Sequence, residues 1–196
     1  MADFGTRELY GGAITVELPT TLIDASDIRQ IPDHQEVFLS NKTLTSIIFE
    51  INQFVKQPDP AALYFHFTDV IAPPDHLAEE LGAPTKLSLA EDSLKDFPAY
   101  LVQGGIISPE VDKKASTSLP IEWQQTPLTT NQLTKCYQLV VRMDKYSTDF
   151  CVRVNVPLKE LSGKEEADAE EAVAKGIMEK IVATLDIKEF GLFASD

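Results

Sequence analysis

Two runs of alternating apolar residues, separated by a short polar segment, constrain the fold of this chain more than any other feature. Each run has an apolar residue at every second position: Tyr137, Leu139, Val141 and Met143 in the first, and Phe150, Val152, Val154 and Val156 in the second. A period of two is typical of strands with one buried face, and the polar segment 145–148 can turn between them. The sequence therefore predicts a β-hairpin with its turn centred near Tyr146 and Ser147.

The two cysteines fall in the two strands of this predicted hairpin. With that turn, Cys136 pairs near Pro157 and Cys151 pairs near Arg142. At ~3.3 Å per residue, roughly 20 Å separates the two thiols, which is too far for a disulfide. The sequence thus predicts two unpaired thiols, as expected in the reducing interior of a cell.

Helical spacing of apolar residues appears in three further segments, and strand patterns appear in four. The predicted helices span 43–55, 61–70 and 165–185, and the predicted strands span 13–18, 36–40, 86–90 and 99–108. Asp59 is the expected N-cap of the second helix, with Pro60 at its first position. Helices before and after a mostly antiparallel sheet give an α+β fold, in which both faces of the sheet are covered as a three-layer α/β/α sandwich. A length of 196 residues without repeats predicts a single domain over residues 1–196.

The last predicted helix has one apolar stripe, formed by Val173, Ile177, Met178, Ile181, Val182 and Leu185. Gly176 lies inside this helix, where glycine is unfavourable, and so suggests a close backbone contact. The segment 190–193 is apolar enough to pack against the domain.

The net charge of −14 and the pI near 4.6 limit the classes of partner. Lysine and arginine form no basic stripe, so binding to nucleic acid is not expected, and an acidic membrane surface would repel the chain. The sequence also has no signal peptide and no run that approaches a membrane span. A basic protein surface suits this charge best, although acidity also serves solubility.

Five acids gather between residues 17 and 36 against a single base, Arg29. These acids are Glu17, Asp24, Asp27, Asp33 and Glu36. Such a cluster repels itself, so it indicates a partner: a metal, a proton donor or a basic protein surface. Two structural explanations stay open, which are a capping box formed by Asp33 and Glu36 and simple solvation of a loop. Asp24 is also a candidate cap for a single turn that ends before Pro32.

Sequence signatures of common enzymes are missing. There is no glycine-rich phosphate loop and no nucleophile elbow. The histidines His34, His66 and His76 form no pair at metal-ligand spacing, and His66 is expected to be a packed or rim residue of its helix. A small hydrolase or metal protein that uses Asp33, His34 and Glu36 remains an alternative.

Two segments together carry a resemblance to a known family. Residues 9–14 read Leu-Tyr-Gly-Gly-Ala-Ile, and residues 23–37 read Ile-Asp-Ala-Ser-Asp-Ile-Arg-Gln-Ile-Pro-Asp-His-Gln-Glu-Val. This combination resembles the signature of the Mog family of Ran-binding guanine-nucleotide release factors, with Ile31 in place of the usual valine. The hairpin with Thr148 and Asp149 in its polar turn and Asn155-Val156-Pro157 is also similar. The resemblance implies a three-layer α/β/α sandwich around an antiparallel sheet, shared with a photosystem extrinsic-subunit superfamily.

The same resemblance implies a function in regulation. A member of this family binds the small GTPase Ran and promotes release of its bound nucleotide, which supports nuclear protein import. Asp33 and Glu36 match the acids implicated in the Ran contact, and Asp24, Asp27 and Arg29 are added because they lie nearby. We expect no catalytic residue, metal or cofactor, a monomer in the nucleus and cytoplasm, and Ran as partner, with a second Ran-binding protein left open. A Ran-binding adaptor without exchange activity is the main alternative.

Overall fold

The computed structural model describes residues 3–111, 129–158, 161 and 163–193. Its described ranges contain two α-helices, α1 (Asp59–Thr68) and α2 (Lys164–Thr184), and eleven strands. The predicted hairpin is confirmed as β9 (Thr129–Met143) and β10 (Thr148–Pro157), joined by a turn of 3-10 helix over Asp144–Tyr146. Neither of these two helices has the length and hydropathy of a membrane span.

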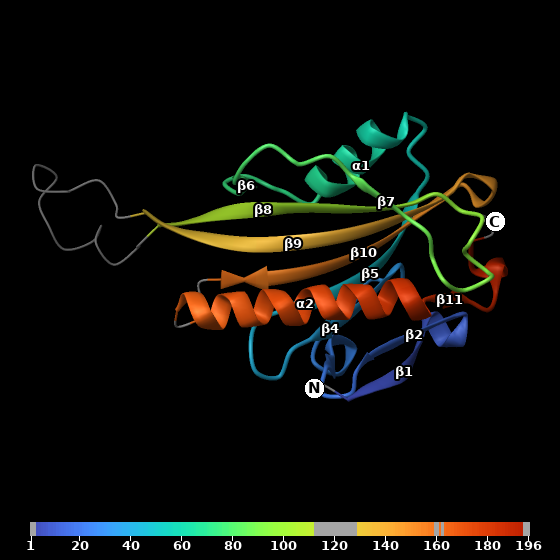
Figure 1. The fold of residues 1–196 in the computed structure, drawn as a ribbon, viewed down its shortest axis with the longest axis horizontal. Helices are drawn as coiled ribbons and strands as arrows, with labels where there is room; N and C mark the ends of the chain where they lie inside the picture. The colour runs from blue at the N-terminus through green and yellow to red at the C-terminus, as the bar shows by residue number, and fades with distance from the viewer. Residues whose placement is uncertain (1–2, 112–128, 159–160, 162, 194–196) are drawn as a thin grey trace, which may run out of the picture.

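The hairpin lies inside an antiparallel sheet of eight strands (Figure 1). The strand order is β3-β4-β5-β10-β9-β8-β6, and β7 pairs with β8. The bounds are β3 (Ile23–Asp24), β4 (Gln35–Leu39), β5 (Ser46–Gln53), β6 (His76–Leu77), β7 (Thr85–Leu87) and β8 (Ala99–Val111). A second antiparallel sheet contains β1 (Phe4–Leu9), β2 (Ile14–Pro19) and β11 (Asp186–Ile187). The prediction of an α+β fold with a mostly antiparallel sheet is confirmed.

The hairpin register differs from the predicted one by two residues. Met143 lies opposite Thr148, so Cys136 pairs with Asn155 and Cys151 pairs with Val140. The prediction placed the turn too late because the 3-10 turn begins directly after Met143. Both cysteines are nevertheless free and buried, so the prediction of unpaired thiols is confirmed.

The predicted helix over 43–55 is wrong, because Ser46–Gln53 forms the strand β5. This strand lies between β4 and β10, inside the sheet. Ile47 and Phe49 are fully buried, while the neighbouring Ile48 is partly buried on the other face. A strand covered on both faces has apolar residues at consecutive positions, and these also satisfy the spacing of a helix.

Helix α2 covers one face of the large sheet together with β2 (Figure 1). Its buried residues Ala174, Ile177, Met178 and Ile181 join a core cluster with the alternating apolar residues of β9 and β10. Val173 was predicted in this stripe but is 47% exposed. The predicted close contact at Gly176 is also wrong, because a Cβ there would meet nothing within 4 Å. Phe193 packs into the same core, as expected for the segment 190–193.

Helix α1 covers the opposite face of the sheet (Figure 1). Its residues Leu63 and Phe67 form a second cluster with Val102, Cys136, Val140 and Cys151 from the strands. Gly104 makes this packing possible, because a Cβ at that position would lie 2.8 Å from Cζ of Phe67 and 2.5 Å from Cδ2 of Leu81. Pro58 rather than Asp59 occupies the N-cap of α1.

Polar side chains share the α1 face with this apolar cluster. Asp149 is fully buried, and its Oδ2 lies 2.8 Å from Nε2 of His66 and accepts a hydrogen bond of 2.9 Å from the backbone N–H of Val55. Nε of Arg142 lies 3.4 Å from Oδ1 of Asp149, and Nη1 of Arg142 pairs with Oδ1 of Asp59 at 3.2 Å. Asp59, expected as a cap, therefore anchors the start of α1 to the sheet. His66, expected to be packed, is confirmed as a buried residue.

Candidate functional site

The acidic loop, residues 25–34, connects β3 to β4 at one edge of the large sheet. The Oδ1 of Asp24 accepts a hydrogen bond of 2.8 Å from the N–H of Ser26 and caps a 3-10 turn over Ala25–Asp27. The prediction of Asp24 as a cap is thus confirmed. Ala25 in this turn is fully buried, which attaches the start of the loop to the core.

A glycine turn after β1 fixes the end of the acidic loop. Gly11 and Gly12 have φ values of 66° and 95°, which glycine adopts without strain and which permit the turn into β2. The turn directs the backbone N–H of Tyr10 toward Glu36, whose Oε1 accepts a hydrogen bond of 2.8 Å. The Tyr10 hydroxyl donates to the backbone oxygen of His34 at 3.1 Å. Two motifs that lie 26 residues apart in the sequence are therefore joined in space.

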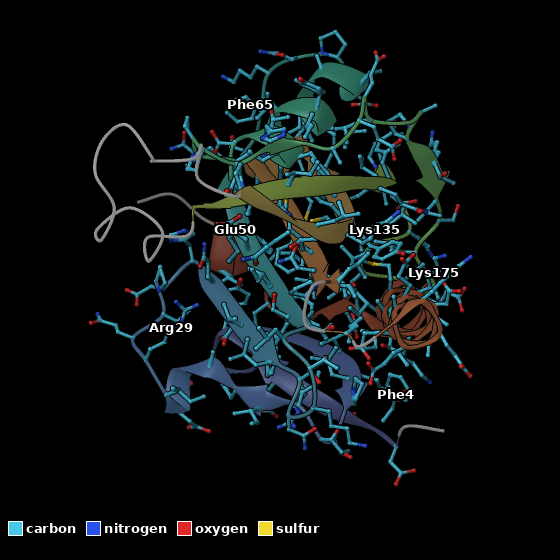
Figure 2. The ribbon with its side chains drawn as sticks, turned by 90° about the vertical axis from the view of Figure 1, so that its left-hand side faces the viewer. Phe4, Arg29, Glu50, Phe65, Lys135 and Lys175 are labelled. Atoms are coloured by element: carbon cyan, nitrogen blue, oxygen red, sulfur yellow. The ribbon has the colours of Figure 1, made fainter. Side chains whose placement is uncertain are left out.

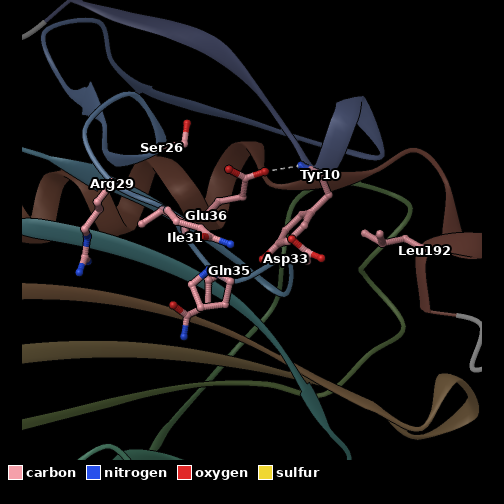
Figure 3. A pocket seen from close by; sticks show the side chains of 10 residues that line it. Tyr10, Ser26, Arg29, Ile31, Asp33, Gln35, Glu36 and Leu192 are labelled. Atoms are coloured by element: carbon pink, nitrogen blue, oxygen red, sulfur yellow. Dashed lines mark hydrogen bonds between the residues drawn. The ribbon is translucent and has the colours of Figure 1, made fainter.

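Three of the five predicted site residues line one cavity of about 530 Å³ beside this turn (Figure 3). They are Arg29, Asp33 and Glu36, and the other lining residues include Tyr10, Ser26, Ile31, Gln35 and Leu192. Asp24 and Asp27 do not line the cavity. Asp24 is occupied as a cap, whereas the side chain of Asp27 is exposed.

Asp33 and Glu36 differ in how they are held. Glu36 is partly buried and fixed by Tyr10, so its second oxygen is the one left for a partner. Asp33 is exposed, and its carboxylate makes no hydrogen bond or ion pair within the described part of the chain. The capping-box explanation fails because the carboxylate of Glu36 binds the N–H of Tyr10.

Glu50 is a third carboxylate at this site that the sequence analysis did not identify. It lies opposite Gln35 in the pairing of β4 and β5, and Nε2 of Gln35 donates to its Oε1 at 2.5 Å. Nε2 of His34 lies 3.7 Å from the same oxygen. The sequence analysis did not identify Glu50 because it predicted a helix over 43–55. In the structure this segment is the strand β5, whose pairing with β4 places Glu50 beside the acidic loop.

The carboxylates of Glu36 and Glu50 both affect the pKa of the Tyr10 hydroxyl. Burial raises the pKa of Tyr10 above its ordinary value of 10.0, and the charges of Glu36 and Glu50 raise it further. The phenol therefore stays protonated at neutral pH and donates its hydrogen bond to His34. The site presents negative charge to the solvent, with Arg29 as the cation that lines the same cavity.

The alternative of a metal site finds no support in this geometry. The carboxylate of Glu36 faces Tyr10, the ring of His34 faces Glu50, and Asp33 is exposed. Among the described residues, no three histidine, cysteine or acidic side chains are grouped as metal ligands. The arrangement is suited to binding basic groups through charge, because its carboxylates have free oxygens at the surface.

Comparisons with known proteins identify the family of this chain. Residues 7–157 match the protein family described as "Ran-interacting Mog1 protein". The chain is 31% identical over 156 residues to a Ran guanine nucleotide release factor from Bos taurus, and the match covers 76% of this chain and 74% of that protein. It is 30% identical over 173 residues to the nuclear import protein MOG1 of Saccharomyces cerevisiae, covering 82% of this chain and 67% of that protein.

Solved structures agree with this assignment at the level of the fold. The Ran-binding protein Mog1p of Saccharomyces cerevisiae has a TM-score of 0.62 at 22% identity, covering 99% of this chain and all of that one. The cyanobacterial PsbP protein of Synechocystis has a TM-score of 0.51 at 8% identity, covering 95% of this chain and 94% of that one. Both share the fold of this chain. The match of the family model over residues 7–157 shows that this chain belongs to the Mog1 family of Ran-interacting proteins.

Proposed function

We propose that this protein binds the small GTPase Ran and promotes release of its bound guanine nucleotide, and that it supports nuclear protein import in this way. Relatives at about 30% identity carry the names of Ran guanine nucleotide release factors and nuclear import proteins. One structural observation supports the proposal most: Asp33 is exposed and unpaired within the described residues, beside the fixed Glu36 in a single open cavity.

The chemistry of a GTPase explains how carboxylates act on nucleotide affinity. A GTPase holds the phosphates of its nucleotide with Mg²⁺, a lysine and backbone N–H groups. Carboxylates docked nearby compete for these cations, or they hold a switch segment in a conformation that binds nucleotide poorly. Either route requires tighter binding to the nucleotide-poor state. A 100-fold loss of nucleotide affinity corresponds to about 2.7 kcal/mol, which a few desolvated charge pairs can supply.

The proposed roles of the five residues are unequal. Asp33 and Glu36 contact Ran, and Arg29 orients the contact from the wall of the same cavity. Asp27 adds charge at the rim, and Asp24 contributes by capping the turn of the loop. In this proposal the protein is a regulator and not an enzyme, and no metal or cofactor takes part.

The remaining parts of the proposal concern organisation. We propose a single domain over residues 1–196 that acts as a monomer in the nucleus and cytoplasm, with room for a second Ran-binding protein in the complex. A three-layer α/β/α description of the fold belongs to the same proposal, and it is supported by the positions of α1 and α2 on opposite faces of the large sheet.

Release of a fluorescent guanine nucleotide from Ran tests the proposal. The native chain should accelerate release, and Asp33→Asn should lose most of this acceleration because the substitution removes the charge without changing the size of the side chain. Asp168→Asn is the matched control, because Asp168 is an exposed acid on α2. Binding without acceleration by the native chain would favour the adaptor, and absence of binding would contradict the proposed function.

The dependence on salt checks the role of charge in the same complex. If carboxylates guide the association, the association rate and the affinity should both fall as the ionic strength rises, because salt screens exposed charges. Surface plasmon resonance at several salt concentrations measures both quantities. An association rate that does not change with salt would count against a charge-driven contact.

A further inference from the structure

We propose that the Ran-binding surface extends beyond the acidic loop into a second cavity beneath α1, and that this cavity receives one apolar side chain of a basic segment of Ran. This inference rests on the proposed function and adds an apolar half to the contact. The second cavity has a volume of about 230 Å³ and is lined by Gln35, Ile48, Glu50, His66, Val70, Cys151 and Arg153.

The two cavities form one continuous surface. Gln35 lines both of them, and its side-chain amide donates to Glu50 in the second. Figure 2 shows Arg29, Glu50 and Phe65 along one side of the molecule, from the acidic loop to α1, whereas Lys135 and Lys175 lie on the other side. A partner that contacts Asp33 is therefore within reach of the outer side of α1.

The second cavity has walls that suit an apolar group. Ile48, Val70 and Cys151 contribute carbon and sulfur surface to it. Val70 is 48% exposed at the rim. Phe65 is 44% exposed, and its ring lies 5.7 Å from that of His66 in an edge-to-face arrangement. Aromatic side chains such as Phe65 are enriched in protein interfaces, and Val70 adds apolar surface beside it.

The charged groups around the cavity define the neighbours of that apolar side chain. Nε and Nη2 of Arg153 donate to Oε1 of Gln138, and Nη2 also donates to the backbone oxygen of His66. His66 is occupied by Asp149. Glu50 on the cavity wall and Asp69 near Arg153 add negative charge, as do Asp33 and Glu36 in the first cavity. An apolar anchor flanked by lysine or arginine side chains complements this pattern.

The experiment compares the affinities of variants for Ran. Phe65→Ala and Val70→Ser should each weaken binding about 5- to 20-fold. Val70 lines the cavity, and the exposed ring of Phe65 packs against His66 in the cavity wall, so each substitution removes apolar surface that the partner would cover. Val173→Ser is the matched control, since Val173 is 47% exposed on α2, and it should bind as the native chain does. Circular dichroism and urea unfolding verify that each variant folds.

Salt separates the two halves of the surface. The loss caused by Phe65→Ala should persist at about 0.5 M salt, where the Debye length is only a few ångströms, whereas the loss caused by Glu50→Gln should shrink. Native affinity in both Phe65→Ala and Val70→Ser, together with a loss in Asp33→Asn, would overturn this inference and leave the proposed function intact. Absence of Ran binding by the native chain would overturn both.

Discussion

The two faces of the large sheet are built from alternate residues of the same strands, yet they differ in chemistry. Toward α2, β10 presents Phe150, Val152 and Val154, all fully buried in the larger apolar cluster. Toward α1, the same strand presents Asp149, Cys151 and Arg153. Asp149 forms an ion pair with Arg142, and Arg153 donates a hydrogen bond to Gln138. The α2 face stabilises the fold through burial of apolar area, whereas the α1 face fixes the position of one helix through directed contacts.

This difference explains why the outer side of α1 is free for a partner. A buried charge is costly unless it is paired. The carboxylate of Asp149 has three polar partners: the backbone N–H of Val55 and the side chains of His66 and Arg142. These contacts hold α1 from below together with a small apolar cluster. The helix can therefore leave Tyr64 and Phe65 exposed without losing its place on the sheet.

The largest effect is expected from Phe150→Ala on the α2 face. The ring of Phe150 is fully buried and stacks with that of Phe49 at a centroid distance of 6.4 Å. Removal of a buried phenyl ring should lower the free energy of unfolding by about 4 kcal/mol, since it loses apolar burial and leaves a cavity. Urea unfolding measures this loss. Val173→Ala on the exposed side of α2 is the control, and an equal loss in both variants would contradict the assignment of the core.

A slightly smaller effect is expected from Asp149→Asn on the α1 face. This substitution keeps the size of the side chain but leaves the buried guanidinium of Arg142 with one carboxylate partner, Asp59. The free energy of unfolding should fall by about 3 kcal/mol. Amide hydrogen exchange should show faster exchange in α1 than in α2, because the lost contacts anchor α1. Equally faster exchange in both helices would argue that the polar contacts of Asp149 have no special role in holding α1.

The third effect in size is a loss of stability at alkaline pH, caused by the two buried cysteines on the α1 face. Burial raises the pKa of Cys136 from 9.0 to about 11 and that of Cys151 from 9.0 to about 12. Above pH 9 the unfolded chain releases these protons while the folded chain keeps them, so stability that is present below pH 9 falls as the pH rises toward 11. The slope should reach about 1.4 kcal/mol per pH unit for each thiol. Urea unfolding from pH 8 to 11 measures it, and Cys151→Ala should flatten it; an unchanged slope in that variant would contradict the burial effect.

The smallest effects on stability should separate Glu36 from Asp33. Glu36→Ala removes the acceptor of the Tyr10 N–H and should cost about 1 kcal/mol, whereas Glu36→Gln retains an acceptor oxygen. Asp33→Asn should change the free energy of unfolding by less than about 0.5 kcal/mol, because the side chain is exposed. Thermal and urea unfolding of the three variants check this order. A large loss in Asp33→Asn would mean that Asp33 supports the fold itself.

The sequence was most informative where one period or one motif determined the local structure. The alternation along β9 and β10, the apolar stripe of α2 and the cap at Asp24 were all predictable, because each depends on neighbours close in sequence. The strand β5 was not predictable from spacing alone, because its burial on both faces depends on which strands lie beside it. The polar contacts of Asp149 with Val55, His66 and Arg142 were missed for the same reason.

In the candidate site, too, features that depend on residues close in sequence were predictable, and contacts between distant segments were not. The motifs at residues 9–14 and 23–37 indicated Asp33 and Glu36, but the hydrogen bond between Tyr10 and Glu36 joins segments that are distant in sequence. Glu50 became visible only with the pairing of β4 and β5. The structure therefore changes the choice of variant, since Asp33→Asn tests the charge while Glu36→Ala also disturbs the turn.

The affinity of Ran for Asp33→Asn, compared with that for Asp168→Asn, tests the central claim most directly. Both substitutions remove one exposed negative charge, but only Asp33 lines the cavity beside the acidic loop. Titration calorimetry should show binding at least about tenfold weaker for Asp33→Asn, a loss of about 1.4 kcal/mol, and native affinity for Asp168→Asn. Native affinity for Asp33→Asn, or an equal loss in both variants, would contradict the claim that this surface binds Ran.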